Sequence, residues 1–365
     1  MGSRHEKPRR ALEQAPNASP TPAGARKDAP AAEKPTGKKV LHWLNSAKGI
    51  GVILVILGHL LYKSSWTTLN QFIYAFHMPM FFLVSGYVQK PTLKRLFLPN
   101  KVLRLLVPFL IYTLFSIPIL SPLMLGEEAG PREVLEDAFY LHGQVSNNPL
   151  WFLMVLFEVY CLFFLLHWAL GHPAGQLLLC AGAFGAGGWL YLHKDVEALH
   201  TLGFNRAVIC FGFFLAGMLL QHLHMEQIRF WHWLLLPVTL LPGLYVGMVL
   251  NEKISFYMFK LRIYHWFLLS ALLLTVAVLL FARLFLDRPG YLAYLSRYSI
   301  VFLGTQFLWM RPLQFHLKDL ELLDTTYAYQ VLFAAAAVYI LFTPLVYDLL
   351  KKYLPFLKLL NGEAL

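Results

Sequence analysis

The sequence predicts an all-α, polytopic membrane protein, a bundle of about ten transmembrane helices with both termini in the cytoplasm. Hydrophobic residues make up 58% of the chain and charged residues only 14%. The chain also contains 29 Phe, 18 Tyr and 9 Trp, which is more apolar surface than a water-soluble core would hide. The hydrophobic residues gather in runs of roughly twenty, the length that crosses about 30 Å of hydrocarbon.

The chain divides into a polar N-terminal segment, a long apolar region and a short C-terminal tail. Residues 1–39 are rich in Pro, Ala, Lys, Arg and Glu, so we expect a disordered cytoplasmic tail. This segment lacks the pattern of a cleaved signal peptide, and we expect the first hydrophobic helix to be retained. Residues 40–352 form the predicted membrane domain, and residues 353–365 form a short cytoplasmic tail.

The apolar runs predict about ten membrane spans, and the charges between them set the orientation. The approximate centres of the spans are Ile53, Phe81, Leu110, Cys161, Phe184, Phe214, Leu240, Leu273, Leu303 and Val338. With the N-terminus inside, the acidic loop at residues 127–137 lies outside the cell. The basic residues that then face the cytoplasm include Lys90, Arg95, Lys101, Arg104, Arg283 and Lys351. This Lys and Arg bias favours the orientation.

Charge and cysteine content exclude several classes of function. The net charge of +11 fits cytoplasmic loops that contact anionic lipid headgroups, so we expect membrane lipids and no nucleic acid as partners. Cys161, Cys180 and Cys210 fall in apolar runs without motif spacing, so no disulfide framework and no metal site is expected. Motifs for ATP hydrolysis, zinc proteolysis and serine hydrolysis do not occur. Nothing in the sequence indicates an oligomeric state.

Four ionisable residues lie within apolar helices or at their ends. His59 follows Lys48 by eleven positions, so the helix turns to within about 20° of its starting direction over a rise of roughly 16 Å. Both side chains therefore share one face. By the same rise, His77 lies at a depth similar to that of His59. Pro79, two residues further on, has no backbone N–H to donate, and this weakening of the helix could open a polar pocket beside His77. Glu158 in the fourth helix reaches a comparable depth.

Each of these residues has a structural explanation as well as a chemical one. A buried histidine can bond a neighbouring carbonyl, Glu158 can pair with a buried cation, and Lys48 can anchor the helix at the inner interface. The chemical explanation covers the whole set. A neutral imidazole held away from bulk water can take a proton from an alcohol that attacks an activated acyl group. Lys48 with Arg95, Lys101 and Arg104 then suits a phosphate-bearing donor at the inner face.

Several segments resemble the membrane-bound acyltransferase-3 family. The first part contains Asn45-Ser46-Ala47-Lys48-Gly49-Ile50 followed by Gly58-His59, and then Phe76-His77-Met78-Pro79 through Gly86-Tyr87. Later segments that are similar to the family are Lys101-Val102-Leu103-Arg104, Leu150-Trp151-Phe152-Leu153 and Phe214-Leu215-Ala216-Gly217. The resemblance runs from about residue 41 to residue 350. In carrying lysine at position 48, the chain resembles the branch that contains fucose 4-O-acetylases, which often has lysine where other branches have arginine.

The resemblance implies a ten-helix bundle that moves an acyl group from cytoplasmic acyl-CoA to a sugar hydroxyl on or across the membrane. It implies that His59 is the essential histidine, that Lys48 is its basic partner and that His77 belongs to a Phe-His-x-Pro motif. It also assigns Arg104 as the basic residue before the third helix. The chain departs from the family at Gln306, near which relatives often carry a histidine, and a glutamine cannot act as a base.

We therefore expect an integral membrane O-acyltransferase that uses acyl-CoA and modifies a glycan or lipid-linked saccharide. An O-acetyltransferase that uses acetyl-CoA is the favoured form, but the sequence leaves open whether the acyl group is acetyl, succinyl or another short chain. The expected location is the plasma (inner) membrane of a bacterium. The expected catalytic residues are His59, His77 and Glu158. The expected donor-binding residues are Lys48, Arg95, Lys101 and Arg104. His59 would act as a general base or form an acyl-histidine, and the sequence leaves both routes open.

The competing class of function is a transporter or flippase of lipid-linked saccharides. In such a protein the histidines and Glu158 would form a proton relay, and the proline-containing second helix would gate a path. The sequence shows no pair of broken helices at corresponding positions in its two halves, which disfavours many transporter folds. A purely structural scaffold would leave the shared depth of His59 and His77 without an explanation.

Overall fold

The computed structural model describes residues 40–61, 67–93, 95–124, 147–193, 203–225, 227, 229–251, 254–256, 258–323 and 325–363. Over these ranges the chain is helical and contains no strand, apart from one isolated bridge between Ser255 and Lys260. The predicted all-α fold class is therefore confirmed. The expected disordered tail at residues 1–39 and the acidic loop at residues 127–137 lie outside the described residues.

Most elements are long α-helices, and short 3-10 or π segments extend or connect some of them. The N-terminal half contains α1 (His42–Leu60), α2 (Thr67–Tyr87), α3 (Phe97–Lys101), η1 (Val102–Leu106), α4 (Val107–Met124), η2 (Asn148–Leu150), α6 (Trp151–Leu166), η3 (His167–Ala169) and α7 (Pro173–Leu192). The C-terminal half contains α8 (Phe204–Leu220), η5 (Gln221–Leu223), α9 (Phe230–Tyr245), η6 (Val246–Leu250), α10 (Tyr264–Phe285), α11 (Tyr291–Leu295), η7 (Ser296–Tyr298), α12 (Ser299–Asp319), α13 (Thr326–Tyr353) and η8 (Pro355–Asn361).

Eight helical segments in the described part of the chain are long and apolar enough to cross a membrane. This finding confirms a polytopic membrane protein. The ten span centres expected from the sequence all lie inside helices, but α2 and α12 are not among the eight. Polar and ionisable residues lower the hydropathy of both, including Asn70 and His77 in α2, and Gln306 and Arg311 in α12. A total of ten spans therefore stays a prediction.

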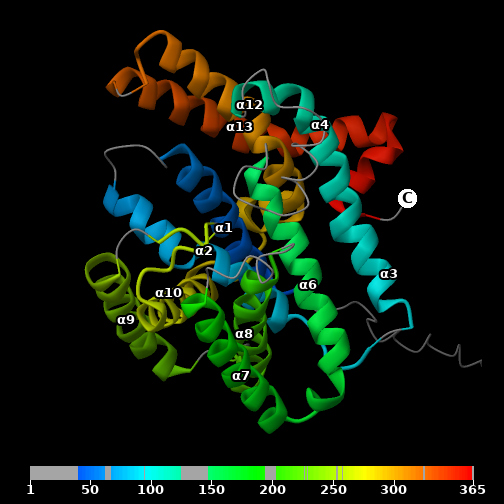
Figure 1. Ribbon diagram of the computed structural model, residues 1–365, viewed down its shortest axis with the longest axis vertical. Coiled ribbons are helices and arrows are strands. Elements are labelled where there is room, and N and C mark those ends of the chain that lie inside the picture. The colour runs from blue at the N-terminus through cyan, green and yellow to red at the C-terminus, as the bar shows by residue number, and fades with distance from the viewer. Residues whose placement is uncertain are drawn as a thin grey trace, which may run out of the picture. The chain divides into compact units, whose positions relative to one another are not determined.

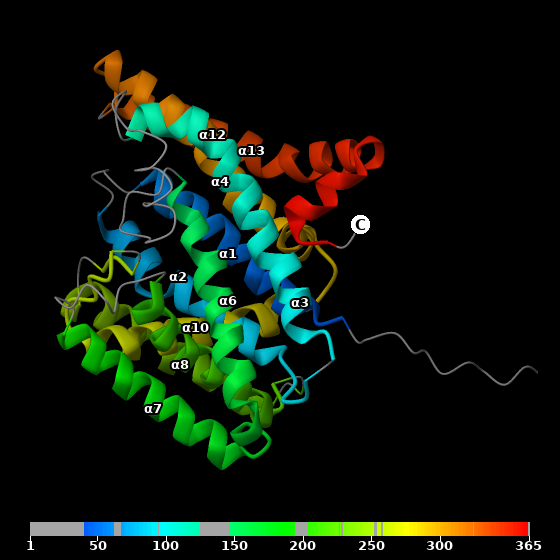
Figure 2. The ribbon, with the colours of Figure 1, turned by 45° about the vertical axis from the view of Figure 1, so that its right-hand side comes forward.

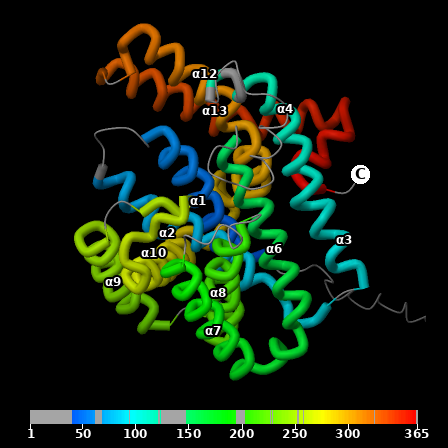
Figure 3. The backbone as a smooth tube through the Cα atoms, viewed as in Figure 1, coloured from blue at the N-terminus to red at the C-terminus, as the bar shows by residue number. Residues whose placement is uncertain are grey.

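The interior of the membrane domain is built around α1, α2 and α8. Helix α1 packs against α2, α10, α11 and α12, whereas α8 packs against α2, α6 and α7 (Figure 1). In the apolar stretch of α8, 67% of the residues are buried inside the domain, compared with 17% in that of α13. In two views α12 and α13 lie at the opposite end of the domain from α7 and α8 (Figure 2). The backbone trace shows α1 running between these two groups of helices (Figure 3).

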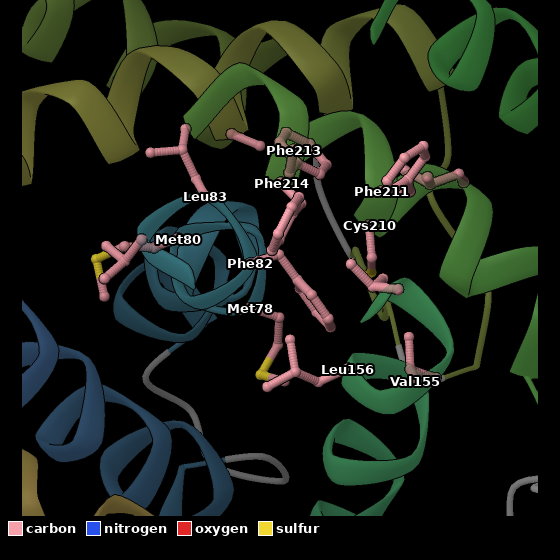
Figure 4. Close-up of a cluster of buried hydrophobic side chains, with 14 of the residues drawn as sticks. Met78, Met80, Phe82, Leu83, Val155, Leu156, Cys210, Phe211, Phe213 and Phe214 are labelled. Carbon is pink, nitrogen blue, oxygen red and sulfur yellow. The ribbon is translucent and has the colours of Figure 1, made fainter. Parts of the chain in front are cut away.

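Two clusters of buried apolar side chains form the core, and α1 contributes to both. The larger cluster joins α2, α6 and α8, and Figure 4 shows Met78 and Phe82 of α2 turned toward Leu156 of α6. The smaller cluster joins α1 to α12 and α13 through residues such as Ile56, which is fully buried. In α1, Val55 belongs to the larger cluster and Ile56 to the smaller one. The seam between the two clusters therefore follows α1.

Small residues let α2 and α8 approach closely. A Cβ atom at Gly86 would collide with the backbone carbonyl of Phe214, and one at Gly217 would collide with that of Leu83. Close backbone approach at small residues is a general way in which membrane helices gain packing energy. This contact holds α2, which carries His77, firmly against the interior helix α8.

Candidate active site

His59 and His77 lie together where the end of α1 meets α2. The two imidazoles are near enough to interact electrostatically. The amide of Asn70 in α2 donates a hydrogen bond of 3.3 Å to the carbonyl of Gly58, the residue before His59. A Cβ at Gly58 would lie 3.0 Å from the side chain of Ile73, so glycine permits the close approach of the two helices here. The end of α1 is thus fixed to the helix that carries His77.

The hydrogen bond of His77 determines which ring nitrogen is free. Its Nδ1 lies 2.7 Å from the carbonyl oxygen of Ile73, and since that oxygen can only accept, Nδ1 carries the proton. In the neutral ring Nε2 then holds the lone pair and is the acceptor. The ring of Tyr74 packs edge-on against His77 at 5.1 Å, and the His77 side chain is buried. This hydrogen bond to a neighbouring carbonyl is the structural explanation expected for a buried histidine, but it involves only Nδ1.

Helix α12 adds two residues to this pair. The ring of Phe307 packs edge-on against His59, with the ring centroids 5.0 Å apart. The guanidinium of Arg311 lies 4.5 Å from the Phe307 centroid, donates to Gln314 at 3.3 Å and acts electrostatically on His59. The site therefore contains two imidazoles and a cation from three helices.

Sequence reasoning missed Arg311, although a signal for it was present. An arginine inside an otherwise apolar helix is as unusual as a histidine there, and such residues mark functional sites by default. What the sequence does not contain is the pairing of α12 with α1, which brings together residues about 250 positions apart. Arg311 could therefore be suspected from the sequence but could not be placed beside His59.

Pro79 does not break α2, which runs without interruption from Thr67 to Tyr87. The residues around it are well packed, because Met78 and Met80 are both buried. A helix in a membrane tolerates proline where neighbouring helices compensate for the lost backbone donor. The helix thus continues through Pro79, and the polar pocket expected beside His77 stays a prediction.

Lys48 lies near the start of α1, where the helix is tied to the segment after α10. The backbone N–H of Trp43 donates to Asp287 at 3.2 Å, and the hydroxyl of Ser46 donates to the carbonyl of Leu286 at 3.1 Å. Gly49, next to Lys48, lies so close to the backbone of Leu292 in α11 that a Cβ there would collide with it. These contacts fix the start of α1, while His59 is held near its other end.

The other predicted donor-binding residues lie on α3 and η1 or just before them. The ammonium of Lys101 lies 3.4 Å from the centroid of the Tyr160 ring, a cation–π contact that holds it against α6. Arg104 is exposed in the π-helical segment η1, and Arg95 is exposed just before α3. π-helical segments are rare and occur often at functional sites. Arg104 and Arg95 are thus accessible to an anionic ligand, whereas Lys101 is engaged with α6.

The C-terminal residues pack beside Arg104. The segment η8 contacts η1, α4 and α12, and Gly362 follows it with a positive φ of 65°. A Cβ at Gly362 would lie 2.5 Å from the carbonyl oxygen of Arg104. Asn361 donates a hydrogen bond of 2.8 Å to the carbonyl of Arg297. The described part of the expected C-terminal tail is therefore helical and packed against the domain.

Glu158 lies in a different neighbourhood from the histidines. It is carried by α6, and its electrostatic neighbours are Arg206 of α8, Cys161 and Cys210. One of its carboxylate oxygens, Oε2, is buried without a hydrogen bond from the described residues. The structure groups Glu158 with Arg206 at the α6–α8 interface, which fits the ion pairing considered from the sequence. Its catalytic role stays a prediction.

Comparison with known proteins gives one family. The family model described as an acyltransferase domain, acyltransferase-3, matches residues 41–349. Neither the curated proteins nor the solved structures contain a significant match to the chain. The matched region contains every helix from α1 to the greater part of α13, and with it both histidines, Lys48, Arg104 and Arg311. The chain therefore belongs to the acyltransferase-3 family and is a membrane acyltransferase.

Proposed function

We propose that this acyltransferase is an O-acetyltransferase that moves an acetyl group from acetyl-CoA to a hydroxyl of a glycan or lipid-linked saccharide. The observation that carries the proposal is the group formed by His59, His77 and Arg311, two imidazoles and a cation from three helices. The proposed location is the plasma membrane of a bacterium. The acyl donor would enter from the cytoplasm, and the acceptor would reach His59 from the opposite side of the membrane.

The transfer requires a base, and His59 is the proposed one. As the acceptor oxygen attacks the thioester carbon, His59 removes the hydroxyl proton; as the C–S bond breaks, the imidazolium returns a proton to the thiolate of CoA. His77, with Nδ1 held by Ile73, offers Nε2 as an acceptor for a second hydroxyl of the saccharide, which would orient the attacking one toward His59. Arg311 supplies positive charge beside His59, where hydrogen-bond acceptors of a sugar would be favoured.

The donor would reach His59 along α1. The helix is continuous from His42 to Leu60, so the rise of roughly 16 Å between Lys48 and His59 holds in the structure. Lys48 and the exposed Arg104 are proposed to hold the phosphates of CoA, with the pantetheine arm extending along α1. Lys101 is a weaker candidate, because its ammonium already contacts the Tyr160 ring.

Purified protein, reconstituted with a lipid extract that contains glycolipids, tests this proposal. The protein would be given acetyl-CoA labelled in its acetyl group, and both free thiol and label in the lipid fraction would be measured. We expect thiol and transferred label to rise together, and mild base should release the label as acetate because the product is an ester. Thiol release without base-labile label in any saccharide acceptor would contradict an O-acetyltransferase.

A further inference from the structure

A cavity lies at the seam between the two core clusters. Its accessible volume is about 50 Å³, several times the roughly 10–15 Å³ that one water molecule needs. Side chains from α1, α2, α6 and α12 line it, and nearly all of them are apolar. The lining residues used below are Val52, Val55, Ile56, Met78, Leu303 and Gln306. Its wall can surround a small hydrocarbon group.

The cavity lies on the Lys48 side of the histidine pair. Val55 and Ile56 precede His59 by one helical turn, about 5 Å along α1 toward Lys48. On α2, Met78 follows His77 along the chain. The lining residues of α12 also precede Phe307, whose ring contacts His59. The cavity therefore lies between the proposed entry of the donor and the proposed base.

Gln306 is the polar group of this cavity that lacks a partner. Its side chain is fully buried, at 0% exposure, and it lines the cavity wall. Among the residues that the structure describes, neither its Nε2 nor its Oε1 has a hydrogen-bond partner. Leaving a buried amide unpaired is costly, and native proteins seldom do it without a functional reason. A ligand that supplies a carbonyl oxygen would satisfy the Nε2–H donor.

We propose that this cavity holds the acyl group of the donor thioester and that the Nε2–H of Gln306 donates a hydrogen bond to its carbonyl oxygen. The inference rests on the proposed function and names its donor class, an acyl-CoA whose acyl chain is short and uncharged. The acceptor oxygen bonds to the carbonyl carbon while His59 takes the proton, and the carbonyl electron pair moves onto the oxygen that faces Gln306. When the C–S bond breaks, this pair re-forms the carbonyl and the thiolate regains a proton from His59.

The apolar wall also determines what the cavity excludes. A succinyl group would bring a carboxylate among Val52, Val55 and Leu303, and burying an unpaired charge there is far costlier than burying a methyl group. Acetyl and butyryl groups carry no such penalty. The cavity thus selects for an uncharged chain, a choice that the sequence leaves open.

Thiol release by the full-length protein from acetyl-CoA, butyryl-CoA and succinyl-CoA, with the glycolipid extract as acceptor, tests the choice of donor. We expect kcat/KM for acetyl-CoA and butyryl-CoA to agree within about tenfold and that for succinyl-CoA to be at least about 100-fold lower. Val55→Phe should narrow the cavity and lower kcat/KM for butyryl-CoA more than for acetyl-CoA. Equal turnover of succinyl-CoA and butyryl-CoA overturns the inference while leaving the proposed function intact. Absence of turnover with every thioester overturns both.

Gln306→Leu tests the hydrogen bond. We expect kcat for acetyl-CoA to fall about 10²- to 10³-fold, as when one oxyanion donor is removed, with little change in KM. The thermal unfolding midpoint should not fall, because leucine replaces an unpaired buried amide by an apolar group. Gln330→Leu, at an exposed position of α13, is the matched control and should keep the wild-type kcat. A wild-type kcat in the Gln306→Leu protein would overturn the role of Gln306.

Discussion

Replacing His77 by asparagine separates the roles of its two ring nitrogens. Asparagine can place its amide Nδ2 near the position of Nδ1 and keep the 2.7 Å hydrogen bond to the carbonyl of Ile73, but it has no group at the position of Nε2. If Nε2 orients the saccharide by accepting from a neighbouring hydroxyl, His77→Asn should remain folded and lose activity. If His77 only bonds Ile73, the variant should keep both stability and activity.

The expected magnitudes for His77→Asn can be worked from this geometry. A retained hydrogen bond limits the loss of stability to about 1 kcal/mol. Losing the group that orients the acceptor lowers the rate about 10²-fold, which corresponds to about 2.7 kcal/mol in the activation free energy. The effect on the rate should therefore exceed the effect on stability. The two quantities are measured by transfer of labelled acetyl and by thermal unfolding in the same detergent.

A matched control for this substitution is His193→Asn. His193 also bonds a carbonyl through Nδ1, at 2.9 Å to Trp189, but it is exposed at the end of α7. This variant should transfer acetyl at the wild-type rate. The reasoning about Nε2 of His77 is refuted if folded His77→Asn protein transfers acetyl within about threefold of the wild-type rate, a difference of under 1 kcal/mol.

Three further substitutions test how the site is held. Asn70→Ala removes the 3.3 Å bond to Gly58 and should lower kcat with a loss of about 1 kcal/mol in unfolding free energy, as read from turnover and thermal melts. Gly217→Ala should cost about 1–3 kcal/mol because its Cβ meets a backbone carbonyl, whereas Gly182→Ala, where no atom lies within 4 Å, should not lower the melting temperature. Arg104→Met should raise KM for acetyl-CoA about tenfold with kcat retained, and an unchanged KM would remove Arg104 from the donor site.

The sequence predicted the fold class, and it gave a similar expected depth for the two histidines, because both depend on local properties. Apolar runs of membrane-spanning length fix which segments are helical, and helix rise fixes the depth of a residue along its helix. Depth counted on two consecutive helices is informative, since a short connection makes them neighbours. His59 and His77 were expected at similar depth, and the structure places them within electrostatic reach.

The rest of the site depends on which helices are neighbours across the membrane plane. Glu158 was expected at a depth comparable to that of the histidines, but α6 presents it to Arg206 of α8 rather than to α1. Depth alone does not contain this lateral information. The pairing of α1 with α12 is equally invisible in the pattern of apolar residues, so Arg311 and the cavity beside Gln306 became evident only in the structure.

The most direct test of the account is transfer of labelled acetyl by the His59→Ala protein. Wild-type and variant proteins would be purified and checked for equal thermal stability. Both would then be given labelled acetyl-CoA with the same acceptor extract. The account predicts that His59→Ala lowers the rate of base-labile label transfer at least about 100-fold, because the proposed base is gone. Transfer at the wild-type rate by folded His59→Ala protein would contradict the central claim that His59 activates the acceptor hydroxyl.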